Sequence, residues 1–322
     1  MLIGLFGRFG EPVRSEDILA DINSKADAQQ TSVLLNNAGG TIPLINLKQR
    51  KIASINIGAP YAYVFNTMLR NYAPVDDFTF GNFNKEQLKY YTTLIIQVTP
   101  ESLAQPETLS YILEAQKEKE VILTGYGNTA SLKLLSAVCA PIVWNPDNSV
   151  IAAGNSAELI FGGIAATNRL SDTISPVYPA GSGFFTQKIR LNYSRPEDVG
   201  VNSANLNKID DIVAEAISQH ATPSAVVMVV KDGTVIFDKA YGSHTYEGNL
   251  PTQTDDIYDI ASVTKTAATT IAVMKLYEQH KLALDGNLGS YLPELRETSK
   301  KNIAVREVML HQAGFINLDF FS

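Results

Sequence analysis

Short apolar runs alternate with longer amphipathic segments in the first half of the chain, from residue 36 to about residue 167. Four runs rich in isoleucine, valine and leucine are bounded by turn-forming residues and predict strands; they are residues 51–57, 92–98, 120–124 and 141–144. Three segments with apolar residues at helical spacing predict helices; they are residues 61–72, 107–119 and 131–138. Uninterrupted apolar strands separated by helices indicate a mostly parallel sheet covered on both faces.

The pattern changes in the second half. A helix with its apolar residues on one face is predicted to begin at Asn202 or Ser203, either of which can serve as its N-cap. Residues 224–230 and 234–237 predict two strands, and the Asp232-Gly233 dipeptide between them is typical of a tight antiparallel hairpin. Because period and composition change across residues 190–205, the predicted fold class is an α/β domain followed by an α+β domain.

Candidate chemistry is sparse in the first half. Ligands bind open parallel sheets beyond the carboxyl ends of the strands, so the loops there are the places to examine. Gly125-Tyr126-Gly127 favours a turn over a ligand cradle, and Asp76-Asp77 favours a solvated turn over a functional carboxylate pair.

Ser262 and Lys265 are the strongest chemical candidates in the second half. They lie three residues apart at the start of a helix, so their side chains occupy one face, one turn apart. The segment from Thr266 to Tyr277 is apolar almost all round, which is typical of a buried helix. A serine needs a base to become a nucleophile, and a lysine desolvated by apolar neighbours can supply one. Ser-x-x-Lys also occurs by chance about once in a chain of this length, so spacing alone leaves a structural role open.

Composition restricts the other functions. The net charge of −7 argues against nucleic-acid binding, which requires a basic surface. The single cysteine, Cys139, excludes an intrachain disulfide and a paired-cysteine metal site, and its apolar neighbours predict a buried thiol. No segment approaches the roughly 18 apolar residues of a membrane span. His220, His244 and His280 lie in polar surroundings and lack the spacing of a metal site.

Residues 32–44, Ser-Val-Leu-Leu-Asn-Asn-Ala-Gly-Gly-Thr-Ile-Pro-Leu, resemble the entry to the second, α/β sandwich domain of glycoside hydrolase family 3. Residues 157–163, followed by 168–170 and 181–183, resemble the exit of that domain. The resemblance implies a parent similar to a β-N-acetylglucosaminidase, whose nucleophilic aspartate lies in a preceding barrel domain that this chain does not contain. No catalytic residue of that family can therefore be placed on this sequence.

Residues 258–268, Tyr-Asp-Ile-Ala-Ser-Val-Thr-Lys-Thr-Ala-Ala, resemble the nucleophile segment of the penicillin-recognising serine hydrolases, which include serine β-lactamases, DD-peptidases and esterases. Further matches follow in family order; they are residues 196–200, 241–242, 282–285, 291–293 and 305–314. The resemblance implies that Ser262 is the acylated nucleophile and Lys265 the proton acceptor, with the Ser262 N–H in the oxyanion hole. In the same family the match at His311 marks a structural turn, so we favour that role over a general base.

The family also uses a Tyr-x-Asn motif and a Lys- or His-x-Gly motif, both expected downstream of the nucleophile. Tyr126-Gly127-Asn128 and Lys231-Asp232-Gly233 match these patterns but precede Ser262, so neither is accepted.

The sequence thus predicts a fragment of a larger hydrolase. Residues 1–31 are expected to be a tail from the missing barrel, 32–192 the α/β domain, 193–202 a linker, and 203–322 an incomplete serine hydrolase domain. Expected substrates of the parent are β-glycosides and an ester or amide, with no cofactor, metal or nucleic acid, at a periplasmic or extracellular site implied by resemblance. The chain alone is expected to have little activity. The competing interpretation is a non-catalytic carbohydrate-binding or scaffold module with a degenerate Ser/Lys pair.

Overall fold

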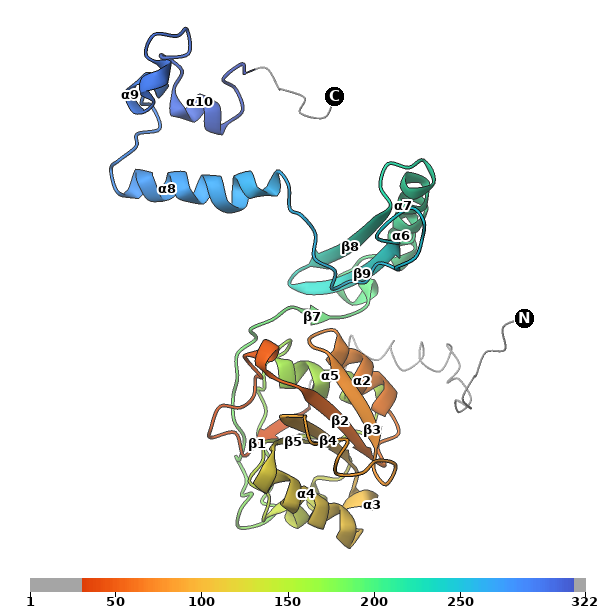
Figure 1. Cartoon of the computed structure of the whole chain (residues 1–322). Coiled ribbons are helices and arrows are strands. Elements are labelled where there is room, and N and C mark those ends of the chain that lie inside the picture. Colours follow the sequence, from red (N-terminus) through yellow and green to blue (C-terminus); the bar gives the residue numbers. More distant parts are fainter. Residues whose placement is uncertain (1–30, 316–322) are drawn as a thin grey trace, which may run out of the picture. The chain divides into compact units, whose positions relative to one another are not determined.

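The computed structural model describes residues 31–315, which fall into two compact units that divide between residues 254 and 255. The first unit contains the α/β domain and a small second sheet, and the second contains the helices α8, α9 and α10 (Figure 1). The predicted tail at residues 1–31 lies, except for Thr31, outside the described residues. The predicted linker at residues 193–202 and the other domain bounds stay predictions.

A six-stranded sheet forms the centre of the α/β domain, with strand order β1-β6-β5-β4-β2-β3. Its neighbours run parallel, except that β1 pairs antiparallel with β6. The strands are β1 (Val33–Leu35), β2 (Ile52–Ile57), β3 (Val75–Thr79), β4 (Thr93–Val98), β5 (Glu120–Tyr126) and β6 (Ile142–Asn145). The mostly parallel sheet is confirmed, and the four predicted runs coincide with β2, β4, β5 and β6 to within a residue or two.

Helices cover both faces of this sheet, α2 and α5 on one and α3 and α4 on the other (Figure 1). They are α2 (Ala62–Arg70), α3 (Pro100–Leu103), α4 (Pro106–Glu118) and α5 (Val150–Phe161). One buried apolar cluster contains Phe65 and Phe161 beneath α2 and α5, and a second contains Ile112 and Trp144 on the α4 side. The helix predicted at residues 131–138 is instead a 3₁₀ helix, η2 (Thr129–Leu135).

The Asp76-Asp77 pair lies in strand β3, so its interpretation as a turn was wrong. β3 is the edge of the sheet and pairs only with β2, which leaves both carboxylates exposed. Asp76 accepts a hydrogen bond of 2.7 Å from the Tyr91 hydroxyl, and Asp77 forms an ion pair with Arg70. Charged residues on an edge strand commonly prevent the strand from pairing with another chain. Because they interrupt the apolar run, a search for apolar runs does not detect such a strand.

Two further predictions were wrong: Cys139 was predicted to be buried, and Gly125 was predicted to lie in a turn. Cys139 is exposed, because it alternates with the buried Val138 and Ala140 on the approach to β6. Gly125 is not in a turn but within β5, directly beneath the ring of Trp144. Only Gly127, with φ of +111°, has the backbone conformation of a turn glycine.

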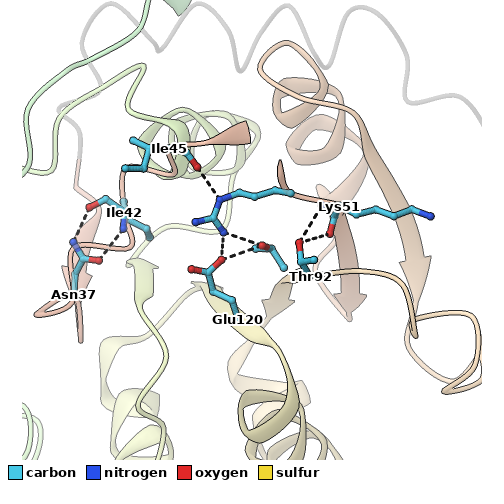
Figure 2. A network of polar contacts seen from close by, with 8 residues as sticks. Asn37, Ile42, Ile45, Lys51, Thr92 and Glu120 are labelled. Carbon is cyan, nitrogen blue, oxygen red and sulfur yellow. Dashed lines mark hydrogen bonds and ion pairs between the residues drawn. The ribbon is translucent and has the colours of Figure 1, made fainter. Parts of the chain in front are cut away.

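The entry and exit segments of the α/β domain lie side by side. Asn168 bridges to Val33 and donates a side-chain hydrogen bond of 3.2 Å to the Ser32 carbonyl. Within the entry segment, the Asn37 amide both donates to the Ile42 carbonyl (2.7 Å) and accepts from the Ile42 N–H (2.9 Å), which closes the loop (Figure 2). These polar residues therefore have a structural role in both segments, because they provide hydrogen-bond partners for backbone groups.

A second polar network ties together the amino ends of the central strands. The Arg50 guanidinium pairs with Glu120 at the start of β5, and donates to the Ile45 carbonyl (2.8 Å) and the Thr93 hydroxyl (3.0 Å; Figure 2). Because Arg50 is only 19% exposed, its charge needs these partners.

The small sheet has the order β7-β9-β8 and includes the predicted hairpin. Its strands are β7 (Asn192–Tyr193), β8 (Ser224–Lys231) and β9 (Thr234–Gly242). Between β7 and β8 the chain forms the 3₁₀ helix η3 (Pro196–Val199) and the helices α6 (Ser203–Leu206) and α7 (Lys208–Ser218). Asp232 and Gly233 both have positive φ, +52° and +75°, as a tight two-residue turn requires. The Asn202 side chain caps α6 through the Ala204 N–H, at 2.8 Å.

Candidate active site

Ser262 precedes the main helical segment of the second unit. A π-helical stretch, Lys265–Thr270, follows it and continues as α8 (Ile271–Glu278). The Lys265 N–H donates to the Ser262 carbonyl (3.0 Å), and the Thr270 hydroxyl donates back to the Lys265 carbonyl (2.9 Å). Wide π-type turns inside helices often occur at functional sites.

Asp259 and Ala261 hold the turn in which Ser262 lies. Ala261 has φ of +40°, in the left-handed region that costs an L-residue roughly 1–2 kcal/mol. Its N–H donates to the Asp259 carboxylate at 2.7 Å. Residues in such conformations cluster at active sites, where the surrounding structure fixes them. The sequence analysis missed Asp259, although an aspartate that accepts from an N–H two residues on is a recognisable turn signal.

The Ser/Lys pair has the geometry that its spacing predicts. The Lys265 ammonium nitrogen lies 2.9 Å from the Ser262 hydroxyl oxygen, within the range for direct proton transfer. Both side chains are exposed. The catalytic roles of the two residues stay a prediction.

The expectation that the helix is buried was wrong for the described residues. Neither the π-helical stretch nor α8 contains a buried residue, and Ile271 and Met274 are 58% and 56% exposed. A helix that is apolar all round needs neighbours on every side, and the described part of the second unit supplies only short elements. These are α9 (Leu288–Tyr291), the 3₁₀ helix η5 (Pro293–Leu295) and α10 (Val305–Met309).

A cavity of about 450 Å³ lies next to Lys265 within the second unit. Thr269 lines it from the helical segment, and Val308 and His311 line it from α10 and the turn after it. The structure thus places His311 on the same cavity as Lys265, whereas Ser262 is not part of the lining. His311 has φ of +56°, and its N–H donates a hydrogen bond of 3.0 Å to the Val308 carbonyl at the end of α10. Both features are those of a structural turn residue.

The two patterns that precede Ser262 both lie in the first unit. Tyr126 is buried in the α/β sheet, and Lys231 to Gly233 form the β8–β9 turn. Between residues 31 and 315 no three histidine, cysteine, aspartate or glutamate side chains gather where they could hold a metal ion. Within the same range, none of the helices has the length and apolar character needed to cross a membrane.

Known proteins match this part of the chain. Residues 209–321 match the model of the family described as Beta-lactamase. A putative D-alanyl-D-alanine carboxypeptidase of Escherichia coli (strain K12) is 28% identical over 138 residues, which cover 39% of this chain and 32% of the relative. The N-acetylmuramyl-L-alanine amidase of Bacillus subtilis (strain 168) is 33% identical over 138 residues, 39% of this chain and 31% of the relative. The chain spans about a third of the length of these relatives.

Among solved structures, a fungal multi-domain β-N-acetylglucosaminidase of glycoside hydrolase family 3 aligns with 78% of this chain and 32% of its own length, with a TM-score of 0.41 and 12% identity. For the second half, the resemblance drawn from residues 258–268 is confirmed: the Beta-lactamase family model matches residues 209–321, which include this segment.

Proposed function

We propose that Ser262 and Lys265 are the nucleophile and the proton acceptor of a hydrolase that cleaves an amide or ester through an acyl-serine intermediate. The observation that carries the proposal is the 2.9 Å contact between the lysine nitrogen and the serine oxygen, inside a β-lactamase-family region. In its neutral form the lysine amine takes the hydroxyl proton while the serine oxygen bonds to the substrate carbonyl carbon. The proton then passes to the leaving group as its bond breaks, and water hydrolyses the acyl-serine.

The substrate class that fits best is a cell-wall peptide. Two relatives that align with this chain over 138 residues are named as a putative D-alanyl-D-alanine carboxypeptidase and an N-acetylmuramyl-L-alanine amidase. A protein that acts on such a substrate works outside the cytoplasm, so we place it in the periplasm or the extracellular space. We propose further that the α/β domain is the second domain of a β-N-acetylglucosaminidase-like glycosidase.

We also propose that this chain by itself is a slow catalyst. A closed active site excludes water from the reacting groups, but the apolar side chains that follow Lys265 are exposed. Neither a Tyr-x-Asn nor a Lys- or His-x-Gly sequence occurs in residues 266–322.

The test is covalent labelling with a fluorophosphonate, followed by mass spectrometry of the intact chain and its peptides. We expect slow labelling at Ser262 that is lost in Ser262→Ala and reduced at least about 100-fold in Lys265→Met, the range of a lost general base. The E. coli carboxypeptidase serves as the positive control for the probe, and Ser290→Ala as the control for an exposed serine elsewhere in the second unit. Equal signals from the wild type and Ser262→Ala, with the positive control labelled, would contradict the proposal.

A non-catalytic role is the second candidate, and the exposure of Ser262 and Lys265 favours it. It predicts no serine-dependent labelling at any time point, so the same experiment separates the two.

A further inference from the structure

The backbone around Ser262 leaves one N–H group open to a substrate. The other N–H groups between residues 261 and 265 donate hydrogen bonds within the turn, at 2.7 to 3.1 Å; they belong to Ala261, Val263, Thr264 and Lys265. The Ser262 N–H has no acceptor among residues 31–315. Because Ser262 is exposed, an oxygen atom of a bound substrate can accept from this N–H.

The direction of that N–H is set by the residue before it. A peptide group is planar, so the backbone angles of Ala261 fix the plane that contains the Ser262 N–H. Ala261 has φ of +40°, a conformation that alanine avoids because its Cβ crowds the following carbonyl oxygen. The hydrogen bond of 2.7 Å from the Ala261 N–H to the Asp259 carboxylate opposes this preference and holds the turn.

The charge of Asp259 gives the reaction no advantage. During acylation the substrate oxygen gains negative charge, and a carboxylate three residues before Ser262 disfavours that charge. Any benefit of Asp259 therefore comes from the geometry of its hydrogen bond. A neutral amide oxygen in the same place accepts from the Ala261 N–H as well.

We propose that Asp259 is a positioning residue for acylation, because it holds Ala261 in the left-handed conformation and so directs the Ser262 N–H at the substrate oxygen. This inference rests on the proposed function of Ser262 and Lys265. As the serine oxygen bonds to the carbonyl carbon and Lys265 takes the hydroxyl proton, the carbonyl oxygen becomes negative and accepts from the N–H. A donor that is fixed in advance lowers the barrier of this step more than it strengthens substrate binding.

The experiment measures fluorophosphonate labelling of the whole chain over time at several probe concentrations. This series separates the affinity for the probe from the rate constant of the covalent step, in which the serine oxygen bonds to phosphorus and fluoride leaves. The phosphoryl oxygen takes the place of the carbonyl oxygen. For Asp259→Ala we expect the covalent rate constant to fall about tenfold, equivalent to about 1.4 kcal/mol, while the affinity stays the same. A residue with a structural role alone would reduce both quantities.

Two comparisons isolate the hydrogen bond from the charge. Asp259→Asn should react within about twofold of the wild type, because its amide oxygen keeps the acceptor. Asp255→Ala is the matched control, since Asp255 is exposed in the same segment and has no hydrogen bond or ion pair with the described residues. It should label as the wild type does.

Ala261→Gly tests the route through the backbone. Glycine adopts positive φ without steric cost, so the turn no longer depends on Asp259. In the Ala261→Gly background, Asp259→Ala should slow the covalent step by less than about threefold, which makes the two substitutions non-additive.

Four results would overturn the inference. Equal covalent rate constants in Asp259→Ala and Asp255→Ala, with the wild type labelled at Ser262, would remove it and leave the proposed function intact. A loss in Asp259→Asn as large as that in Asp259→Ala would assign the effect to charge, and an undiminished loss in the Ala261→Gly background would exclude the backbone route. If the wild type is not labelled at Ser262 while the E. coli carboxypeptidase is, the proposed function and this inference fall together.

Discussion

Replacing Gly125 with alanine tests the packing of the core of the α/β domain. A Cβ built on Gly125 would lie 2.3 Å and 2.4 Å from ring carbons Cζ3 and Cε3 of Trp144, where ordinary contacts begin at 3.4 Å. The ring would have to move by about 1 Å in a close-packed interior. Trp144 is fully buried and its indole N–H donates to the Gly127 carbonyl at 2.9 Å, so any movement also strains this bond.

We expect Gly125→Ala to lower the free energy of unfolding by about 1–4 kcal/mol. Overpacking of a core typically costs ~1–3 kcal/mol, and a weakened hydrogen bond adds up to about 1 kcal/mol. Trp144 is the only tryptophan, so its fluorescence during urea denaturation reports the unfolding of this domain alone.

Gly39→Ala is the matched control, because a Cβ at Gly39 meets no atom within 4 Å. In a Trp144→Phe background the cost of Gly125→Ala should shrink, since the smaller ring leaves space above the glycine. A change of less than about 0.5 kcal/mol in the wild-type background, the size of an ordinary surface effect, would refute the stacking of Trp144 on Gly125.

Three further substitutions test other parts of the chain. Gly154→Ala should raise the free energy of unfolding by about 0.5–1 kcal/mol in the same fluorescence assay, because this α5 glycine has room for a methyl group and alanine favours a helix; destabilisation would contradict the packing of α5. Arg50→Met should cost about 1.5–3 kcal/mol by leaving the half-buried Glu120 without its partner, and a neutral result would argue against the network at the strand ends. The Arg306 guanidinium lowers the pKa of Asp285 from 3.8, so this pair should stabilise the second unit above about pH 4 and lose its effect as the pH falls through the lowered pKa. Circular dichroism of Asp285→Asn should therefore show reduced stability at pH 7 and a weaker dependence on acid, and an unchanged acid transition would refute the pairing.

The elements that the sequence predicted well are those whose signal is local. Apolar runs such as residues 93–98 specify a buried strand, because every side chain must avoid water on both faces of a parallel sheet. The Asp232-Gly233 turn was predictable because few residues accept positive φ. The contact between Ser262 and Lys265 followed from helical spacing alone, since the two residues are neighbours within one turn.

The predictions that failed and the strand that was missed depend on residues far apart in the chain. β3 was missed because its carboxylates are tolerated only at the edge of a sheet, and the position of a strand in a sheet is a property of the whole fold. The burial of the helix after Lys265 was predicted from its composition, but burial requires neighbours, and the described part of the second unit does not provide them.

The sequence by itself therefore determined strands β2, β4, β5 and β6, the β8–β9 hairpin and the Ser/Lys pair, because periodicity and turn chemistry act over a few residues. The tertiary structure alone decided that Trp144 covers Gly125, that His311 reaches the cavity beside Lys265, and that residues 80–92 enclose a second cavity against α4. Each of these joins residues far apart in the chain, and their proximity is fixed only when whole elements pack together.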